Sequence, residues 1–183
     1  MKIIPAAIAD VLIIEPTVFG DSRGYFFESF NARAFAEQTG VEVNFVQDNE
    51  SLSTYGVVRG LHFQKPPHAQ AKLVRVVQGA VLDVAVDLRR NSPTFGQHVA
   101  VELTGENHRQ IFIPRGFAHG FSVLSEKVLF QYKCDNYYMP QSEGALAWDD
   151  PMLAIDWHIP PDRVMLSAKD RCHPSMKDFV TPF

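Results

Sequence analysis

Short apolar runs separated by turn residues dominate the pattern of the chain. The runs are rich in Val, Ile, Leu and Phe, and turn residues lie between them at 78–79, 91–93, 104–107 and 125–126. Runs of this kind are typical of β-strands, and their close spacing favours a sandwich or barrel over alternating strand–helix units. The predicted strands are 10–15, 25–30, 44–48, 71–77, 80–88, 98–103, 110–114, 119–124 and 127–133.

Only one helix is strongly indicated. Asn31 is a suitable N-cap for the segment ARAFAEQ at 32–38, and Gly40 follows as a stop. A second helical turn is indicated at Ser167–Asp170, and the tail after Asp170 has little pattern of its own. We therefore predict one all-β domain over residues 1–183, with a short N-terminal extension, one or two short helices and a C-terminal tail.

Three polar side chains interrupt faces that are otherwise largely apolar. Alternate residues of a strand share a face, which places Lys72, Asp83 and Tyr132 on the same faces as Val, Ala or Phe neighbours. If these faces line the interior of a barrel, the three polar groups require partners or a ligand. This is the first indication of a site.

Composition narrows the class of protein without identifying a function. The 183 residues carry a formal charge of −4, from 17 Lys and Arg against 21 Asp and Glu, which argues against a broad basic surface for nucleic acid. No apolar run is long enough to cross a membrane, and no signal peptide is recognisable. The two cysteines, Cys134 and Cys172, are then expected to be thiols of a cytoplasmic protein.

Two short motifs resemble those of the cupin superfamily. Pro114–His119 reads PxGxxH, like the second cupin motif, and Gly56 is followed after five residues by His62, as in the first. Metal-binding cupins have a second His and a Glu where this sequence has Gln64 and Lys72. An amide and an ammonium in place of two ligands disfavour a divalent ion. The resemblance therefore predicts no metal, and Lys72 could stabilise an oxyanion in its place.

Each of these residues also has an ordinary structural explanation. Lys72 could be a solvated strand lysine, His62 a satisfied core histidine, and His119 a residue that fits the turn after the preceding glycine. Tyr132 on an apolar face is more often part of a core than a catalyst. The other five histidines, His173 included, show no arrangement that indicates a site. The local pattern alone leaves both interpretations open.

Longer blocks resemble one family in particular, the dTDP-4-dehydrorhamnose 3,5-epimerases, which are cupin-fold enzymes of the dTDP-L-rhamnose pathway. The blocks follow the family's order over nearly the whole chain. They are VFGDSRGYFFESFN (18–31), FVQDNES (45–51), VVRGLHFQ (57–64), AKLVRVVQG (71–79), DVAVDLRRNSPTFG (83–96), IPRGFAHGFSVLSE (113–126), QYKCDNYY (131–138) and LSAKD (166–170).

The resemblance implies a cofactor-independent isomerase that forms a precursor of cell-surface polysaccharide. Its substrate is dTDP-4-dehydro-6-deoxy-D-glucose, whose C4 ketone acidifies the protons at C3 and C5. Either carbanion delocalises onto O4 as an enolate. Removal of a proton from one face and its return to the other inverts each centre and gives dTDP-4-dehydro-L-rhamnose.

The resemblance also implies four catalytic roles. His62 is the general base, because an imidazole with a pKa near 6.5 works at neutral pH. Asp170 orients it, as in other base–orienter pairs. Tyr132 delivers a proton from the opposite face, since a phenol is protonated at pH 7. Lys72 stabilises the enolate oxygen.

The remaining implied residues bind the substrate. The phosphates are assigned to Arg59 and the thymine to stacking by Phe19, and a second subunit is expected to contribute a group of contacts, which makes a homodimer the expected assembly. The implied contacts are Gln47 and Asn49 to the nucleotide, His119 to the sugar with Asp83 behind it, Glu143 and Lys169 along the same site, and Arg23, Phe26 and Glu28 from the second subunit.

Three alternatives remain at this point. A relative could invert only C3 or only C5, or isomerise the same sugar, because these enzymes share the fold and the base. A non-catalytic cupin that binds a sugar or nucleotide would not need His62, Asp170 and Tyr132 together. A metal-dependent cupin oxygenase would need ligands in place of Lys72 and Gln64.

Overall fold

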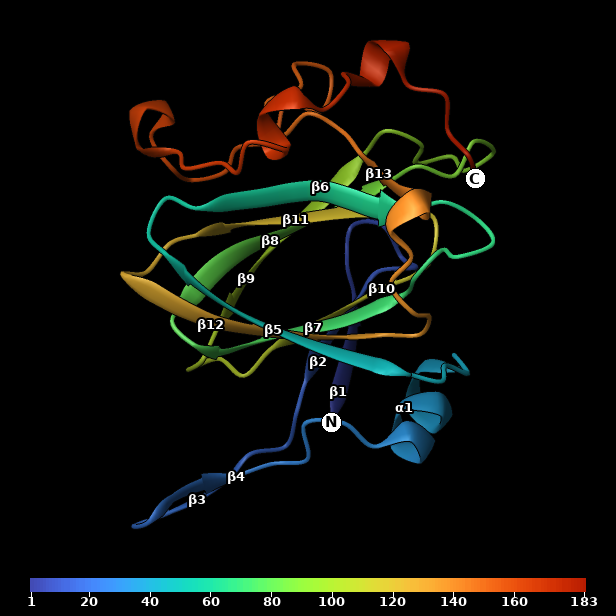
Figure 1. Ribbon diagram of the computed structural model, residues 1–183. Coiled ribbons are helices and arrows are strands. Elements are labelled where there is room, and N and C mark those ends of the chain that lie inside the picture. Colours follow the sequence, from blue (N-terminus) through green and yellow to red (C-terminus); the bar gives the residue numbers. More distant parts are fainter.

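Two antiparallel sheets form the body of the protein in the computed structural model, which describes all 183 residues (Figure 1). The first sheet has six strands in the order β1-β2-β10-β7-β12-β5, and the second has five in the order β13-β6-β11-β8-β9. The first comprises β1 (Lys2–Pro5), β2 (Leu12–Glu15), β10 (Gln110–Ile113), β7 (Lys72–Gln78), β12 (Lys127–Cys134) and β5 (Gln47–Thr54). The second comprises β13 (Glu143–Ala145), β6 (Val58–Gln64), β11 (Phe117–Val123), β8 (Ala80–Asp87) and β9 (His98–Thr104).

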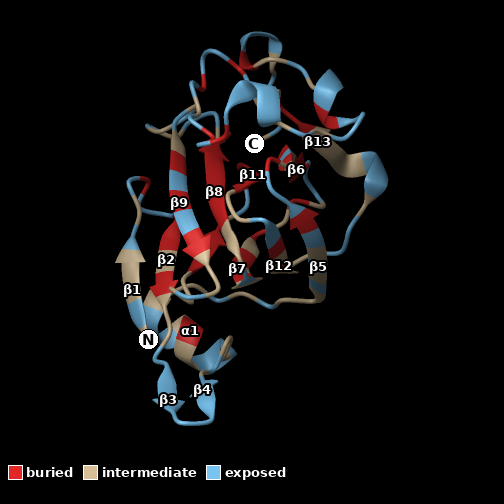
Figure 2. Cartoon of the chain, turned by 90° about the vertical axis from the view of Figure 1, so that its left-hand side faces the viewer, coloured by how far each residue is buried: buried red, intermediate tan, exposed pale blue.

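The core lies between the two sheets and on their outer faces. Valines and phenylalanines from both sheets, among them Val74, Phe121 and Phe130, form the central cluster. A second cluster lies where the C-terminal segment covers the five-stranded sheet, around Leu146 and Trp157. Figure 2 shows the buried residues concentrated in the strands. These packed faces confirm the predicted all-β class.

The predicted helix is confirmed as α1 (Ala32–Thr39). The Asn31 side chain accepts a hydrogen bond from the backbone N–H of Ala34, and Gly40 ends the helix in the left-handed conformation. Phe35 packs this helix on the outer face of the six-stranded sheet. No helix has the length and apolar character that crossing a bilayer requires.

A two-stranded hairpin, β3 (Phe19–Asp21) and β4 (Gly24–Phe26), projects from the body on the side away from β6 (Figure 1). Every residue of its two strands is exposed (Figure 2). At the other end of the chain, short 3-10 helices lie in the segment that covers the five-stranded sheet. They are η1 (Pro140–Ser142), η2 (Pro161–Arg163), η3 (Asp170–Cys172) and η4 (Met176–Asp178).

Several predicted boundaries are wrong. Strand β5 covers 47–54 rather than 44–48, because its sequence QDNESLST alternates exposed polar residues at a sheet edge and has no apolar run. Strands β1, β3, β6 and β13 are absent from the predicted set. The run 25–30 is a strand only to Phe26, since Phe30 turns to pack on Phe35. The C-terminal turn begins at Asp170 rather than ending there.

One close approach positions β6 against β11. Gly60 has a φ of +122°, and a Cβ on it would lie 2.6 Å from the Cα of Gly120. Only glycine permits this contact, because a side chain would collide with the neighbouring backbone. Two residues later, His62 pairs in register with His119 on β11.

Candidate active site

A pocket of about 310 Å³ lies where β5, β7 and β12 of one sheet meet β6 and β13 of the other. It is lined mainly by polar side chains, which distinguishes it from the core on either side. Six of the predicted site residues line it: Gln47, Asn49, His62, Lys72, Tyr132 and Glu143.

His62 and Asp170 form the expected pair, although 108 positions separate them in the sequence. Nε2 of His62, on β6, lies 2.6 Å from Oδ1 of Asp170, on η3. The hydroxyl of Ser167 donates to Oδ2 of the same carboxylate at 2.7 Å. The Asp170 side chain is only 5% exposed, whereas that of His62 is 33% exposed. A buried carboxylate thus holds an imidazole that remains accessible from the pocket.

The electrostatics of this pair favour a neutral imidazole beside an ionised carboxylate. Burial lowers the pKa of His62, and the charge and hydrogen bond of Asp170 only partly offset this effect. Burial raises the pKa of Asp170, but the hydrogen bond from Ser167 and the nearby His62 outweigh it and leave a lowered pKa. A carboxylate can only accept, so Nε2 carries the proton and Nδ1 of His62 carries the lone pair.

Lys72 and Tyr132 lie on the opposite side of the pocket, on neighbouring strands β7 and β12. The Lys72 ammonium lies 5.9 Å from the centre of the Tyr132 ring and has no ion pair within the chain. Burial lowers the pKa of Lys72, opposed by the charges of Asp83 and Glu143. Burial raises the pKa of Tyr132, so its hydroxyl is protonated at neutral pH. The two residues offer a cation and a proton donor.

A second histidine–carboxylate pair lies deeper between the sheets. Nε2 of His119, on β11, lies 2.9 Å from Oδ2 of Asp83, on β8, and both side chains are buried. The His119 ring is stacked on Phe130. Oδ1 of Asp83 has no hydrogen-bond partner in the chain. The expected pairing of these two residues is present, and it fixes the His119 ring.

Three charged residues from the predicted set surround this core of the site. Arg59 donates to the hydroxyl of Ser53 from Nε and Nη2, at 3.2 and 3.1 Å, and its charge acts on Tyr132. Lys169, next to Asp170, forms an ion pair with Glu143. Burial raises the pKa of Glu143, but the bond from Lys169 outweighs it and leaves the pKa lowered.

Four predicted contacts do not reach this pocket within one chain. Phe19, Arg23 and Phe26 belong to the exposed hairpin, and Glu28 follows it. Arg23 is paired with Asp21 of the same hairpin. Figure 1 shows the hairpin far from β6, where His62 lies. Phe19, Arg23, Phe26 and Glu28 can therefore act at such a site only from another copy of the chain.

Gln64 has a structural role that the motif comparison missed. Its amide Nε2 donates to the carbonyls of His68 and Tyr137 at 2.7 and 3.1 Å, and its Oε1 accepts from the N–H of Met139 at 2.6 Å. A side chain that closes two loops with three hydrogen bonds is not free to act as a metal ligand. The residue that replaces the second cupin histidine thus holds the rim of the pocket.

Other lining residues were also missed. Tyr138 lines the pocket and donates to Glu143 at 3.2 Å. Gln70, Phe63 and Cys134 complete the wall, and burial raises the pKa of Cys134 to about 11, which keeps its thiol protonated. Tyr138 ends the block QYKCDNYY. A tyrosine in such a turn-rich segment could have been proposed as a site residue from the sequence.

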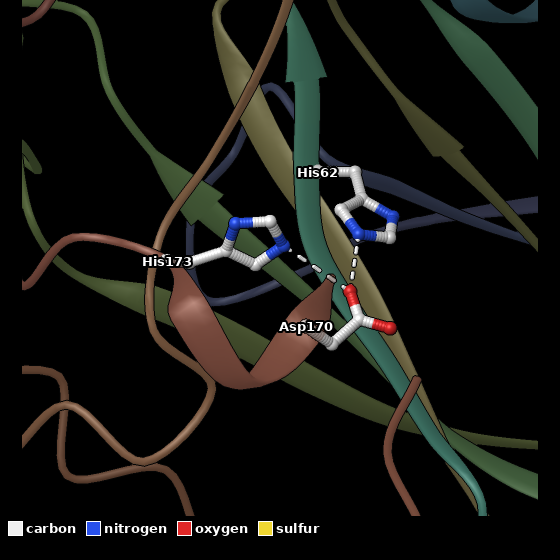
Figure 3. Close-up of side chains that lie close together, drawn as sticks. All are labelled: His62, Asp170 and His173. Carbon is white, nitrogen blue, oxygen red and sulfur yellow. Dashed lines mark hydrogen bonds and ion pairs between the residues drawn. The ribbon is translucent and has the colours of Figure 1, made fainter. Parts of the chain in front are cut away.

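The sequence pattern does not indicate a role for His173. In the structure this residue lies against the His62–Asp170 pair. Its Nε2 is 3.3 Å from Oδ1 of Asp170, the same oxygen that His62 contacts (Figure 3). These three side chains are also the group whose donor atoms could approach a metal ion together, within 4.8 Å of one another. Both imidazoles are turned onto one carboxylate oxygen, which is the arrangement of a hydrogen-bonded cluster.

Comparison with known proteins agrees with this geometry. The family model described as dTDP-4-dehydrorhamnose 3,5-epimerase matches residues 5–178. The chain belongs to the dTDP-4-dehydrorhamnose 3,5-epimerase family. This epimerase is 56% identical to the enzyme of that name from Salmonella typhimurium, over 95% of this chain and 94% of the relative. The assigned class is therefore an isomerase, as predicted.

Solved structures extend the comparison to the fold. A dTDP-6-deoxy-D-glucose-3,5-epimerase from Legionella pneumophila, solved in complex with dTDP-4-keto-L-rhamnose, is 51% identical to this epimerase. Its TM-score is 0.94, with 98% of this chain and 94% of that chain covered. The sandwich is thus the cupin jelly roll predicted from the motifs. A 3′-monoepimerase from Streptomyces bikiniensis, solved with dTDP-quinovose, is 32% identical with a TM-score of 0.87, over 94% and 87% of the two chains.

Proposed function

We propose that the chain, acting as one domain over residues 1–183, epimerises dTDP-4-dehydro-6-deoxy-D-glucose at C3 and C5 to dTDP-4-dehydro-L-rhamnose. The observation that carries the proposal is the pocket in which the His62–Asp170 pair faces Lys72 and Tyr132. A base, a cation and a protonated phenol are the groups that enolisation next to a ketone requires. Membership of the family supplies the substrate class.

In the proposed reaction, Nδ1 of His62 removes a proton from the carbon next to the C4 ketone. Asp170 holds the ring by its Nε2–H and stabilises the imidazolium that forms. The electron pair moves to O4, where the ammonium of Lys72 stabilises the enolate. Tyr132 then protonates the carbon from the opposite face, which inverts the centre. The same groups serve C3 and C5 because both carbons adjoin C4.

Remote contacts position the sugar for this chemistry. In the proposal, Arg59 meets the pyrophosphate, Gln47 and Asn49 bind the nucleotide, and His119 contacts the sugar with its ring fixed by Asp83. Glu143 and Lys169 line the same site. Such contacts matter because proton transfer tolerates little misplacement of the reacting carbon. The cationic side chains also match an anionic pyrophosphate in a chain whose net charge is −4.

The proposal includes a homodimer in which the hairpin β3–β4 of one chain completes the pocket of the other. Phe19 and Phe26 on this hairpin are 64% and 67% exposed, which is unusual for large aromatic side chains in a monomer. Phe19 would stack near the thymine, and Arg23, Phe26 and Glu28 would contact the ligand across the interface. A cytoplasmic location is also proposed, because Cys134 and Cys172 are unpaired thiols that suit a reducing compartment.

The reaction is tested by incubation with the substrate in heavy water and proton NMR of the sugar. Deuterium at both C3 and C5, with formation of the L-rhamno product, is expected. Deuterium at one carbon only would reduce the function to that of a monoepimerase, and none at either would refute it. His62→Asn should abolish exchange at both carbons, whereas His158→Asn, a change at an exposed histidine, should retain it.

The shared site is tested by mixing two inactive homodimers, His62→Asn and Arg23→Ala, after brief dissociation. Half of the random dimers are mixed, and one of their two sites would have both His62 and a hairpin with Arg23. Activity should therefore recover to about one quarter of the wild-type value. If each hairpin served its own chain, every site would lack one residue and no activity would return.

A further inference from the structure

The Asp170 carboxylate is shared by two imidazoles rather than one (Figure 3). Oδ1 lies 2.6 Å from Nε2 of His62 and 3.3 Å from Nε2 of His173. The two rings are perpendicular, with an angle of 88° and centres 5.6 Å apart. Oδ2 accepts from Ser167. Three donors thus surround this carboxylate, and the proposed mechanism uses only one of them, His62.

The C-terminal segment holds His173 in this position. The residue follows η3 directly, and its side chain is 11% exposed. The next residue, Pro174, accepts a backbone hydrogen bond from Ala147 at 2.8 Å. The N–H of Met176 donates to the buried carboxylate of Asp150 at 2.6 Å. A ring that is this firmly anchored can restrict the carboxylate that it contacts.

We propose that His173 is a positioning residue for the catalytic pair, acting through Asp170 to fix the His62 ring. Its Nε2–H occupies one side of Oδ1 and leaves the remaining side for the Nε2–H of His62. The carboxylate cannot then rotate without losing a hydrogen bond to Ser167, His62 or His173. The inference rests on the proposed role of His62 as the base.

The same contact tunes the basicity of the pair. A donor on Asp170 spreads the negative charge of the carboxylate, which weakens its hold on the proton of His62. Removal of the His173 donor should therefore raise the pKa of His62. The other charged groups around the pair are Lys72, Glu143 and Lys169 on the pocket side, and Asp149 and Arg171 in the hollow that His173 also lines. None of these changes in the variants below.

The test measures kcat, KM and the pH dependence of kcat/KM for His173→Ala and His173→Gln, with EDTA present. The alanine variant should lose about three- to tenfold in kcat with little change in KM, as expected for one weak hydrogen bond. Its acid limb should move to higher pH by a few tenths to about one unit. The glutamine variant retains an N–H donor and should recover most of the lost kcat.

Each outcome bears on the proposal. Wild-type kcat with an unmoved acid limb in His173→Ala would overturn it, and so would a glutamine variant as slow as the alanine variant. Thermal melting is recorded for both, because a purely structural role would lower the melting temperature and leave the acid limb in place. His158→Asn is the control, because this histidine is exposed and asparagine tolerates its left-handed backbone conformation. Exchange that persists in His62→Asn would instead refute the base assignment, which is a separate failure.

Discussion

Lys72 offers the sharpest test of how the pocket stabilises an enolate. The substitution Lys72→Met keeps the length and volume of the side chain and removes its charge. The ammonium makes no ion pair within the chain, so the change leaves no carboxylate without a salt-bridge partner. Its effect on activity therefore reports the interaction with the reacting sugar rather than a broken network.

The expected magnitude follows from the position of the charge. A cation about 4 Å from an oxyanion, at an effective dielectric constant of about 20, contributes about 4 kcal/mol. That corresponds to about 10³ in rate, and loss of a single oxyanion donor in enzymes costs about 10²–10³. We therefore expect kcat to fall by about 10²–10³. Burial lowers the pKa of Lys72, which means that the charged side chain is less favourable in the folded state than in water. The variant, which lacks this charge, should therefore be at least as thermally stable as the wild type at pH 7.

The assay follows deuterium incorporation at C3 and C5 together with product formation, and thermal melting is measured on the same samples. Lys65→Met, at an exposed lysine just beyond β6, is the matched control and should keep wild-type activity. A Lys72→Met enzyme that retains kcat within about threefold would refute the electrostatic argument. So would a large drop in melting temperature, because it would show that the ammonium supports the fold.

Three further predictions address other parts of the site. Tyr132→Phe should still exchange protons through His62, but it should form product about 10²–10⁴ times more slowly than the wild type. Product formation within about tenfold of the wild-type rate would contradict the role of Tyr132 as the acid. The acid limb of kcat/KM should lie below pH 6.5, because burial lowers the pKa of His62 and only its neutral form accepts a proton; a limb above 6.5 would contradict this. Gln64→Ala should destabilise the fold by about 1–3 kcal/mol in urea unfolding, since three partners lose their bonds, whereas Gln97→Ala, at an exposed position, should have no effect.

Alternation along the strands predicted part of the site correctly. Lys72 and Tyr132 each share a face with core residues, and that face does line the interior between the sheets. The same reasoning placed Asp83 inside, where it is fully buried. Period-two patterns succeed here because a strand with one buried face fixes the direction of every side chain.

Contacts between distant segments could not be predicted in this way. Nothing in the local pattern connects Asp170 with His62, and that pairing was expected only from the family resemblance. His173 stands in no motif of the sequence, and its partner oxygen becomes apparent only once the tail is folded onto β6. Strand β6 itself was missed since Gly60, which permits its approach to β11, breaks the apolar run.

The proposed base and its carboxylate come from segments that are far apart in the chain. His62 belongs to a strand in the first half of the chain, and Asp170 to the segment that covers the finished sheets. Both sheets are complete by residue 145, so the carboxylate comes from a part of the chain that adds no strand to either sheet. The proposed pair therefore forms only when the segment after residue 145 closes over the five-stranded sheet. Local unfolding of that segment would separate the base from its carboxylate and expose the buried cluster around Trp157.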